Sequence, residues 1–205
     1  MISILDYGAG NLRSVENTLD AIGAEHELIH DAAEIARATQ IVLPGVGHFG
    51  QMMRELDRLE VRDPLVNAIR SGVPFLGICL GLQALFTGSE EAPEARGLGI
   101  FEGHVRRFRG GLRVPHMGWN NLRRVRESKL LEKTAALLEK TAAGPYVYFA
   151  HSFFAPVVDA TAAACEYGSE FSAVIERGNL FAVQFHPEKS GPVGLQIVRN
   201  FASLS

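Results

Sequence analysis

The sequence predicts an α/β fold: a three-layer, mostly parallel open sheet with helices on both faces and an antiparallel C-terminal extension. Up to about residue 90, short apolar runs alternate with amphipathic ones, which is the pattern of parallel strands covered by helices. From Gly97 onward the segments are shorter and separated by glycines, which indicates antiparallel strands joined by turns. A chain of 205 residues, 47% of them hydrophobic, buries one core well, so we expect a single domain over residues 1–205.

The first half of the chain predicts four strands. They are ISIL (2–5), HELI (26–29), IVLPG (41–45) and VPFLGIC (73–79). The segments between them predict helices at Asn11–Ile22 and near Ala32–Ala38. Residues 49–71 predict one broken helix or two short ones, because Pro64 interrupts the helical pattern.

The second half predicts mainly strands. We expect them near Val147–Ala150, Ala162–Tyr167, Ser172–Glu176 and Leu180–Phe185. Arginine and apolar residues roughly alternate in HVRRFRGGLR (104–113), which indicates a half-exposed strand pair. The heptad LLEKTAA occurs twice in residues 130–143 and predicts a short amphipathic helix, since two heptads are too few for a coiled coil. Gly191-Pro192 opens a final helix from Val193 to about Leu204, because the first turn of a helix tolerates proline.

Composition excludes several classes of protein. The formal net charge is −3 and 21% of residues are charged, so nothing marks a nucleic-acid or acidic-membrane surface. Two cysteines form no disulfide framework, and the histidines and cysteines show no metal-ligand spacing. The N-terminal apolar run is too short for a signal peptide, and no run reaches the length of a membrane span. We therefore expect a cytoplasmic, soluble protein without a cofactor.

The stretch GICLGLQALF (77–86) places a cysteine between two glycines where a strand turns into a helix. A helix N-terminus favours a thiolate over a thiol, which makes Cys79 a candidate nucleophile. Gly77-x-Cys79-x-Gly81 has the spacing of a sharp nucleophile elbow, in which the next N–H, that of Leu80, serves as an oxyanion donor. The alternative is a small buried structural cysteine.

A second motif, QFHPEKS (184–190), supplies the partners that such a nucleophile needs. His186 and Glu188 lie two residues apart, and an extended segment would put both side chains on one face. The carboxylate then orients the imidazole, and the imidazole faces the thiol, as in a catalytic triad. The alternative for HPE alone is an ordinary surface turn.

A third motif, PGVGHFG (44–50), follows the strand IVL. Its glycines let the backbone approach a ligand and aim N–H groups at it, which suits a second oxyanion donor near Gly47. A phosphate cradle is the competing interpretation, but the Lys-Ser/Thr ending of a P-loop is missing.

Together, GICLGLQ, HPEKS, PGVGHFG and VPHMGWN resemble the class I, triad-type glutamine amidotransferases. Within them, the sequence is similar to the glutaminase subunits of imidazole glycerol phosphate synthases, which act in histidine biosynthesis. The resemblance covers nearly the whole chain and implies hydrolysis of L-glutamine to glutamate and ammonia. It also implies the fold of these amidotransferases.

The resemblance implies a role for each matching residue. Cys79 would be the nucleophile, His186 the general base and acid, and Glu188 the orienter of His186. The oxyanion hole would comprise backbone at Gly47 and Leu80. Residues that would hold the amino-acid end of glutamine are Gln83, Glu91, Ser152 and Phe153.

The resemblance also implies a partner, because ammonia released into water would be protonated and lost as a nucleophile. In this family the partner is a cyclase subunit with a (β/α)8-barrel, which uses the ammonia to make imidazole glycerol phosphate and aminoimidazole carboxamide ribotide. Residues that match its docking face are Asn11, Met117, Trp119 and Lys189. The rival functions are a glutaminase for another synthase, a free-standing γ-glutamyl hydrolase, and a silent regulatory module.

Overall fold

The computed structural model describes residues 1–8, 11–134 and 145–204. An eight-stranded sheet forms its centre, in the order β2-β1-β3-β4-β13-β12-β11-β8. The five strands from β2 to β13 are parallel, and the remaining three are antiparallel. Their bounds are β1 Ile2–Leu5, β2 His26–Ile29, β3 Ile41–Gly45, β4 Phe75–Cys79, β13 Leu180–Val183, β12 Glu170–Arg177, β11 Thr161–Glu166 and β8 Arg123–Arg124. The predicted mostly parallel sheet with an antiparallel extension is confirmed.

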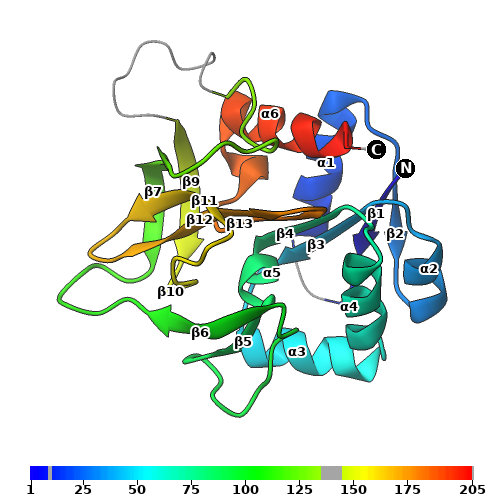
Figure 1. Cartoon of the computed structure of the whole chain (residues 1–205), viewed down its shortest axis with the longest axis horizontal. Coiled ribbons are helices and arrows are strands. Elements are labelled where there is room, and N and C mark those ends of the chain that lie inside the picture. Colours follow the sequence, from blue (N-terminus) through cyan, green and yellow to red (C-terminus); the bar gives the residue numbers. More distant parts are fainter. Residues whose placement is uncertain (9–10, 135–144, 205) are drawn as a thin grey trace.

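Helices cover both faces of this sheet (Figure 1). Helices α1 (Leu12–Ile22) and α6 (Gly191–Ala202) lie together on one face, while α3 (Phe49–Arg58), α4 (Arg62–Arg70) and the short α5 (Leu80–Gln83) lie on the other. Helix α2, Ala32–Arg37, packs beside α4 near the β2 edge. None of the helices within the described ranges is long and apolar enough to cross a membrane.

Alternation of side chains along the central strands builds a separate core on each face. In β1, Ile4 packs with Val15 and Ile197 of α1 and α6, whereas its neighbour Leu5 packs in the opposite core with Met52 of α3. Successive residues of a strand point to opposite faces, so strands covered on both sides are apolar at nearly every position. This is why IVL is a continuous apolar run and ISIL is interrupted only by Ser3, whose buried hydroxyl donates to Glu27 Oε1.

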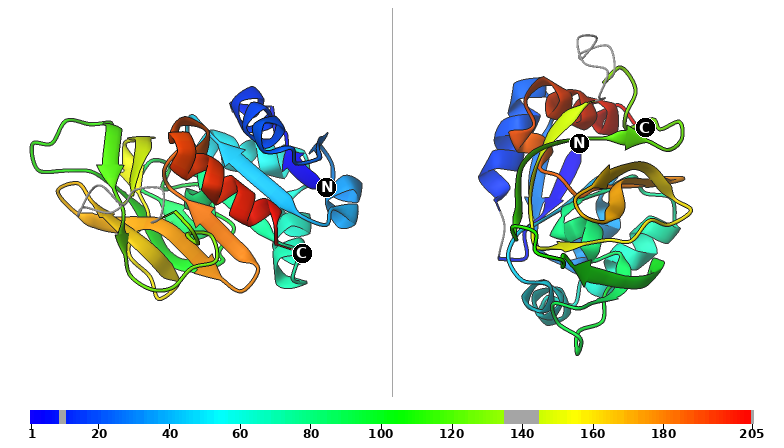
Figure 2. Two further views of the ribbon diagram at one scale, coloured as in Figure 1. Left: turned by 90° about the horizontal axis from the view of Figure 1, so that it is seen from above. Right: turned by 90° about the vertical axis from the view of Figure 1, so that its left-hand side faces the viewer.

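Two smaller sheets lie beyond the central one. Strands β5 (Phe86–Ser89), β6 (Phe101–Arg107) and β10 (Phe153–Phe154) form one of them. Strands β7 (His116–Asn121) and β9 (Tyr146–His151) form a two-stranded antiparallel ribbon. The ribbon lies at the end of the molecule away from β2 and α2, as the views in Figures 1 and 2 agree.

Several local predictions need correction. Residues 49–71 form two short helices, as predicted, but Pro64 does not separate them: α3 ends at Arg58, Glu60 adopts a left-handed φ of 57°, and Pro64 lies in the first turn of α4. The helix expected after Cys79 is a single turn, since backbone N–H groups of Leu98 and Ile100 bond to the carbonyls of residues 84 and 85. Tertiary pairing thus makes Phe86–Ser89 a strand, β5.

Residues 104–113 are likewise no strand pair. Only 101–107 form a strand, β6, which pairs in parallel with β5 and antiparallel with the distant β10. The helix predicted for residues 130–143 does not begin at Leu130, because residues 130–134 form turns. Residues 135–143 of that prediction lie outside the described part of the chain.

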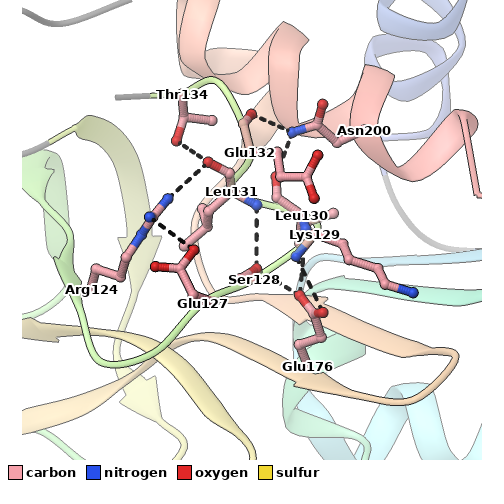
Figure 3. A network of polar contacts seen from close by, with 10 residues as sticks. All are labelled: Arg124, Glu127, Ser128, Lys129, Leu130, Leu131, Glu132, Thr134, Glu176 and Asn200. Atoms are coloured by element: carbon pink, nitrogen blue, oxygen red, sulfur yellow. Dashed lines mark hydrogen bonds and ion pairs between the residues drawn. The ribbon is translucent and has the colours of Figure 1, made fainter. Parts of the chain in front are cut away.

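Hydrogen bonds attach residues 128–132 to strand β12 of the central sheet and to helix α6 (Figure 3). The Glu176 carboxylate on β12 accepts from Ser128 Oγ at 2.6 Å and from the N–H groups of Lys129 and Leu130. Asn200 on α6 donates to the carbonyls of Leu130 and Glu132, at 2.9 and 2.7 Å. One carboxylate therefore accepts hydrogen bonds from three donors of this segment.

We expect Glu176→Ala to lower the free energy of unfolding by about 1–3 kcal/mol, because three donors, two of them in partly buried hydrogen bonds, lose a charged acceptor. Chemical denaturation measures this. Glu170→Ala on the same strand is the control: it removes an exposed ion pair with Arg123 and should cost about 0–1 kcal/mol. Equal losses in the two variants would contradict the anchoring role of Glu176.

Candidate active site

Cys79 lies at a sharp turn between β4 and α5. Its backbone has φ 55° and ψ −105°, a left-handed conformation that is strained for a residue with a side chain. A Cβ on Gly77 would lie 2.7 Å from the Gly81 carbonyl oxygen, and one on Gly81 would collide with the carbonyl of Leu43 on β3. The two glycines are therefore required by close backbone approach, and the predicted elbow is formed.

His186 and Glu188 follow β13 and interact directly. His186 Nδ1 lies 2.8 Å from Glu188 Oε1, and only 3% of the Glu188 side chain is exposed. Residues 187–189 form a 3-10 turn, so the expectation of an extended segment is wrong although the predicted contact is present. Because Nδ1 faces Glu188, Nε2 is the ring nitrogen left to interact with Cys79, which lines the same cavity.

The charge state of His186 follows from this placement. Burial lowers the pKa of His186, but the hydrogen bonds to Cys79 and Glu188 raise it more, so the pKa lies above its ordinary value of 6.5. An imidazolium that is held by a carboxylate on one side favours a thiolate over a thiol on the other. The fold thus closes the sequence gap between Cys79 and His186.

Two further polar residues support this group and were missed in the sequence. Gln184 is fully buried, and its Nε2 donates to Cys79 Sγ at 3.7 Å. Ser190 donates to the His186 carbonyl at 2.7 Å and accepts from the Tyr148 N–H at 2.9 Å, which fixes the turn after His186. The sequence pattern could have predicted Gln184, because it lies two residues before His186 at a strand end, and this spacing places both side chains on the same side of the strand.

Cys79 and His186 open onto a cavity of about 180 Å³. Its wall includes most of the residues predicted for the site: Gly47, Cys79, Leu80, Gln83, Glu91, Met117, Ser152, Phe153 and His186. Gly47 has a φ of 95°, which glycine adopts readily. The PGVG segment and the start of α5 therefore face the same cavity, as an oxyanion hole requires.

The residues predicted to hold glutamine are themselves bonded together. Gln83 Nε2 donates to the Phe153 carbonyl at 2.8 Å and to Gln184 Oε1 at 3.1 Å. Glu91 Oε2 accepts from the Phe49 N–H at 2.7 Å, so this carboxylate also holds the start of α3 just after the PGVG segment. Ser152 lines the cavity, and its carbonyl accepts from the Phe108 N–H.

Three of the residues predicted at a partner interface lie near the mouth of the cavity. Met117 and Trp119 on β7 are 65% and 55% exposed, although both are large and apolar. Trp119 packs edge-on against Tyr148, and Lys189 Nζ lies 5.9 Å from the centre of the Tyr148 ring. Asn11 lies at the start of α1, a helix that packs against residues 187–189, and its Oδ1 accepts from Ser14 Oγ.

Comparison with known proteins agrees with this geometry. The sequence profile of the family described as "Glutamine amidotransferase class-I" matches residues 3–204. The chain belongs to the class I glutamine amidotransferases.

Within this family, two relatives are named "Imidazole glycerol phosphate synthase subunit HisH". The protein from Methanothermobacter thermautotrophicus is 47% identical over 100% of this chain and 98% of its own length. The protein from Thermosynechococcus vestitus is also 47% identical, over 99% of this chain and 96% of its own length. This amidotransferase therefore belongs to the family of these subunits.

A solved structure described as "Crystal structure of glutamine amidotransferase" has a TM-score of 0.73 at 18% identity and covers 99% of each chain. At this identity the likeness concerns the fold alone, and it agrees with the α/β architecture of this amidotransferase.

Two buried imidazoles lie beside the cavity of this amidotransferase, and one of them, His151, lines it. His116 Nδ1 lies 3.1 Å from His151 Nε2, across the β7–β9 ribbon. Burial lowers the pKa of His116 from 6.5 to about 4. Burial, together with the charges of His116 and His186, lowers the pKa of His151 to about 3, against the hydrogen bond to Phe153. Both rings are therefore neutral at neutral pH.

These depressed values predict a specific acid sensitivity. Between pH 6.5 and about 4, the unfolded chain binds protons that the folded chain does not, so the free energy of unfolding falls as pH falls through this window. His151→Asn should make that dependence shallower, by up to about 1.4 kcal/mol per pH unit. Denaturation of both proteins at several pH values in this window checks it, and parallel curves would contradict it.

Proposed function

We propose that the chain is the glutaminase subunit of an imidazole glycerol phosphate synthase, hydrolysing L-glutamine to glutamate and ammonia in L-histidine biosynthesis. One observation carries the proposal: the buried imidazole of His186 is hydrogen-bonded to the Glu188 carboxylate and lines the same cavity as Cys79, whose interaction with the ring raises the pKa of His186. The full-length relatives named as HisH subunits support the assignment to this synthase.

In the proposed reaction, the Cys79 thiolate adds to the γ-carbonyl carbon of glutamine. The oxyanion is held by the backbone N–H groups of Leu80 and the PGVG segment at Gly47. Collapse of this intermediate breaks the C–N bond, and the His186 imidazolium gives its proton to the departing ammonia. A water molecule then attacks the γ-glutamyl thioester and gives a proton to His186, which releases glutamate and restores the thiolate–imidazolium pair.

The amino-acid end of glutamine would lie against Gln83, Glu91 and the backbone at Ser152 and Phe153. Glu91 Oε2 is occupied by the Phe49 N–H, which leaves Oε1 for a cationic donor such as the α-ammonium group. The γ-amide and the amino-acid end of the substrate would then both contact the PGVG segment or residues that are hydrogen-bonded to its neighbours.

The ammonia would pass to a cyclase subunit with a (β/α)8-barrel, in a heterodimer. Exposed Met117 and Trp119 beside the cavity support this, because large apolar side chains on a surface are typical of a protein interface. Lys189 near the same face and Asn11 are the further candidates for contact.

We also propose that residues 1–205 act as one domain, which the match over residues 3–204 supports. A cytoplasmic location remains a prediction.

Cys79→Ala should abolish glutamate release, because no other described thiol faces the cavity, while glutamine still binds. Glutamate release and calorimetric glutamine binding measure the two effects. Cys165→Ala is the matched control: that thiol is buried in β11, where burial raises its pKa to about 12, and turnover should remain. Turnover by Cys79→Ala above background would exclude Cys79 as the nucleophile.

The cyclase assignment has its own test. We expect glutamate release to be strongly stimulated by the cyclase subunit of the same organism when that subunit carries its nucleotide substrate, since the partner would select the productive state of the PGVG segment. Equal activity with and without the partner would indicate a free-standing hydrolase. No activity in either condition would indicate a silent regulatory module.

A further inference from the structure

A continuous chain of hydrogen bonds runs through the buried face of the β7–β9 ribbon to the cavity. Asn120 Nδ2 lies 3.4 Å from His116 Nε2, and His116 Nδ1 lies 3.1 Å from His151 Nε2. His151 Nδ1 in turn lies 2.8 Å from the carbonyl oxygen of Phe153. We call these three side chains, Asn120, His116 and His151, the imidazole relay.

The direction of every bond in the relay is fixed by its ends. A carbonyl oxygen only accepts, so His151 Nδ1 carries a proton and donates to Phe153. A neutral imidazole has one N–H, so His151 Nε2 is an acceptor, and His116 Nδ1 must be its donor. By the same rule His116 Nε2 is an acceptor, and the Asn120 amide nitrogen donates to it.

The amide of Asn120 is also held in one orientation. Its Oδ1 accepts from the Asn121 N–H at 2.8 Å, and its Nδ2 donates to the Glu166 carbonyl at 3.0 Å. The amide is therefore not free to flip, and its NH2 group faces His116. Both rings are thus held as the Nδ1–H tautomer.

The relay ends at a carbonyl that belongs to the predicted substrate site. The Phe153 oxygen accepts from His151 and also from Gln83 Nε2, so two side chains from different elements hold one peptide. His151, Ser152, Phe153 and Gln83 all line the cavity. Movement of that peptide would change the backbone that meets the amino-acid end of glutamine.

We propose that His151 is a positioning residue for glutamine, held by His116 and Asn120, and that it fixes the Ser152–Phe153 backbone through the Phe153 carbonyl. The proposal rests on the glutaminase function proposed above. A purely structural histidine in a buried ribbon requires only that its ring nitrogens have hydrogen-bond partners. Here the last donor of the relay is also aimed at the wall of the cavity.

Two substitutions separate positioning from packing. In His151→Asn, the side-chain amide nitrogen lies near the position of Nδ1 and preserves the bond to Phe153. His151→Leu fills the site but donates nothing. We expect His151→Leu to raise the KM for glutamine by about 3- to 10-fold with kcat within about twofold, as for loss of one hydrogen bond used in ground-state binding. His151→Asn should restore KM to within about twofold of wild type.

Glutamate release is measured with the cyclase subunit present. The control is Ile69→Ala on α4, which removes buried side-chain volume in the opposite core and should lower stability without changing KM. An unchanged KM in His151→Leu, or a KM that rises equally in the Asn, Leu and Ile69 variants, would overturn the proposal. If the wild-type pair releases no glutamate, the proposed function fails instead.

A second measurement needs no variant to be active. Two-bond proton–nitrogen NMR spectra of the folded wild-type protein near neutral pH should show His116 and His151 as Nδ1–H tautomers, with Nε2 unprotonated. His116→Asn and His151→Asn assign the two signals. Because free histidine favours the other tautomer, an Nε2–H form in either ring would overturn the relay.

Discussion

Three backbone segments, the end of β3, the end of β4 and the first turn of α5, approach one another closely around Cys79. The rest of the site depends on this constraint. A Cβ on Gly45 would lie 2.7 Å from the Leu80 Cβ, and side chains on Gly77 or Gly81 would meet backbone atoms of the same turn or of β3. Only glycine lets β3 and the β4–α5 turn come this close. Their contact brings the PGVG segment and the Leu80 N–H to the same side of the thiol, and it holds Cys79 in its strained conformation.

Electrostatic pairing within a buried site decides what this turn can do chemically. Burial alone would leave His186 neutral, as it leaves His116 and His151 neutral, but Glu188 and Cys79 on its two sides favour the charged ring. Three histidines within one region thus differ in charge because their partners differ. The neutral rings of His116 and His151 each donate and accept hydrogen bonds beside the cavity, whereas the charged ring of His186 faces the thiol.

The polar wall of the cavity depends on elements that are far apart in sequence. Gln83 from α5, Gln184 after β13 and the Phe153 carbonyl in β10 form one hydrogen-bonded set. Each pair of buried polar groups that satisfy one another avoids the cost of burying an unpaired donor or acceptor. The same pairing restricts the positions of the atoms that a small substrate would meet.

The sequence by itself determined the strands of the central sheet except the short β8, the two-sided helical cover and the candidate residues of the site. Continuous apolar runs such as IVL are typical of strands covered on both faces, and the spacings in GICLG and HPE indicate a nucleophile elbow and an oriented imidazole. Tertiary structure decided the rest, because it depended on partners from distant segments. Phe86–Ser89 is a strand since residues 97–101 bond to it, 187–189 are a 3-10 turn, and Gln184 and His151 join the site only when strands far apart in the chain lie side by side. Local patterns carry backbone preference and burial, whereas hydrogen-bond partners across more than one hundred residues, such as Gln83 and Gln184, exist only in the folded chain.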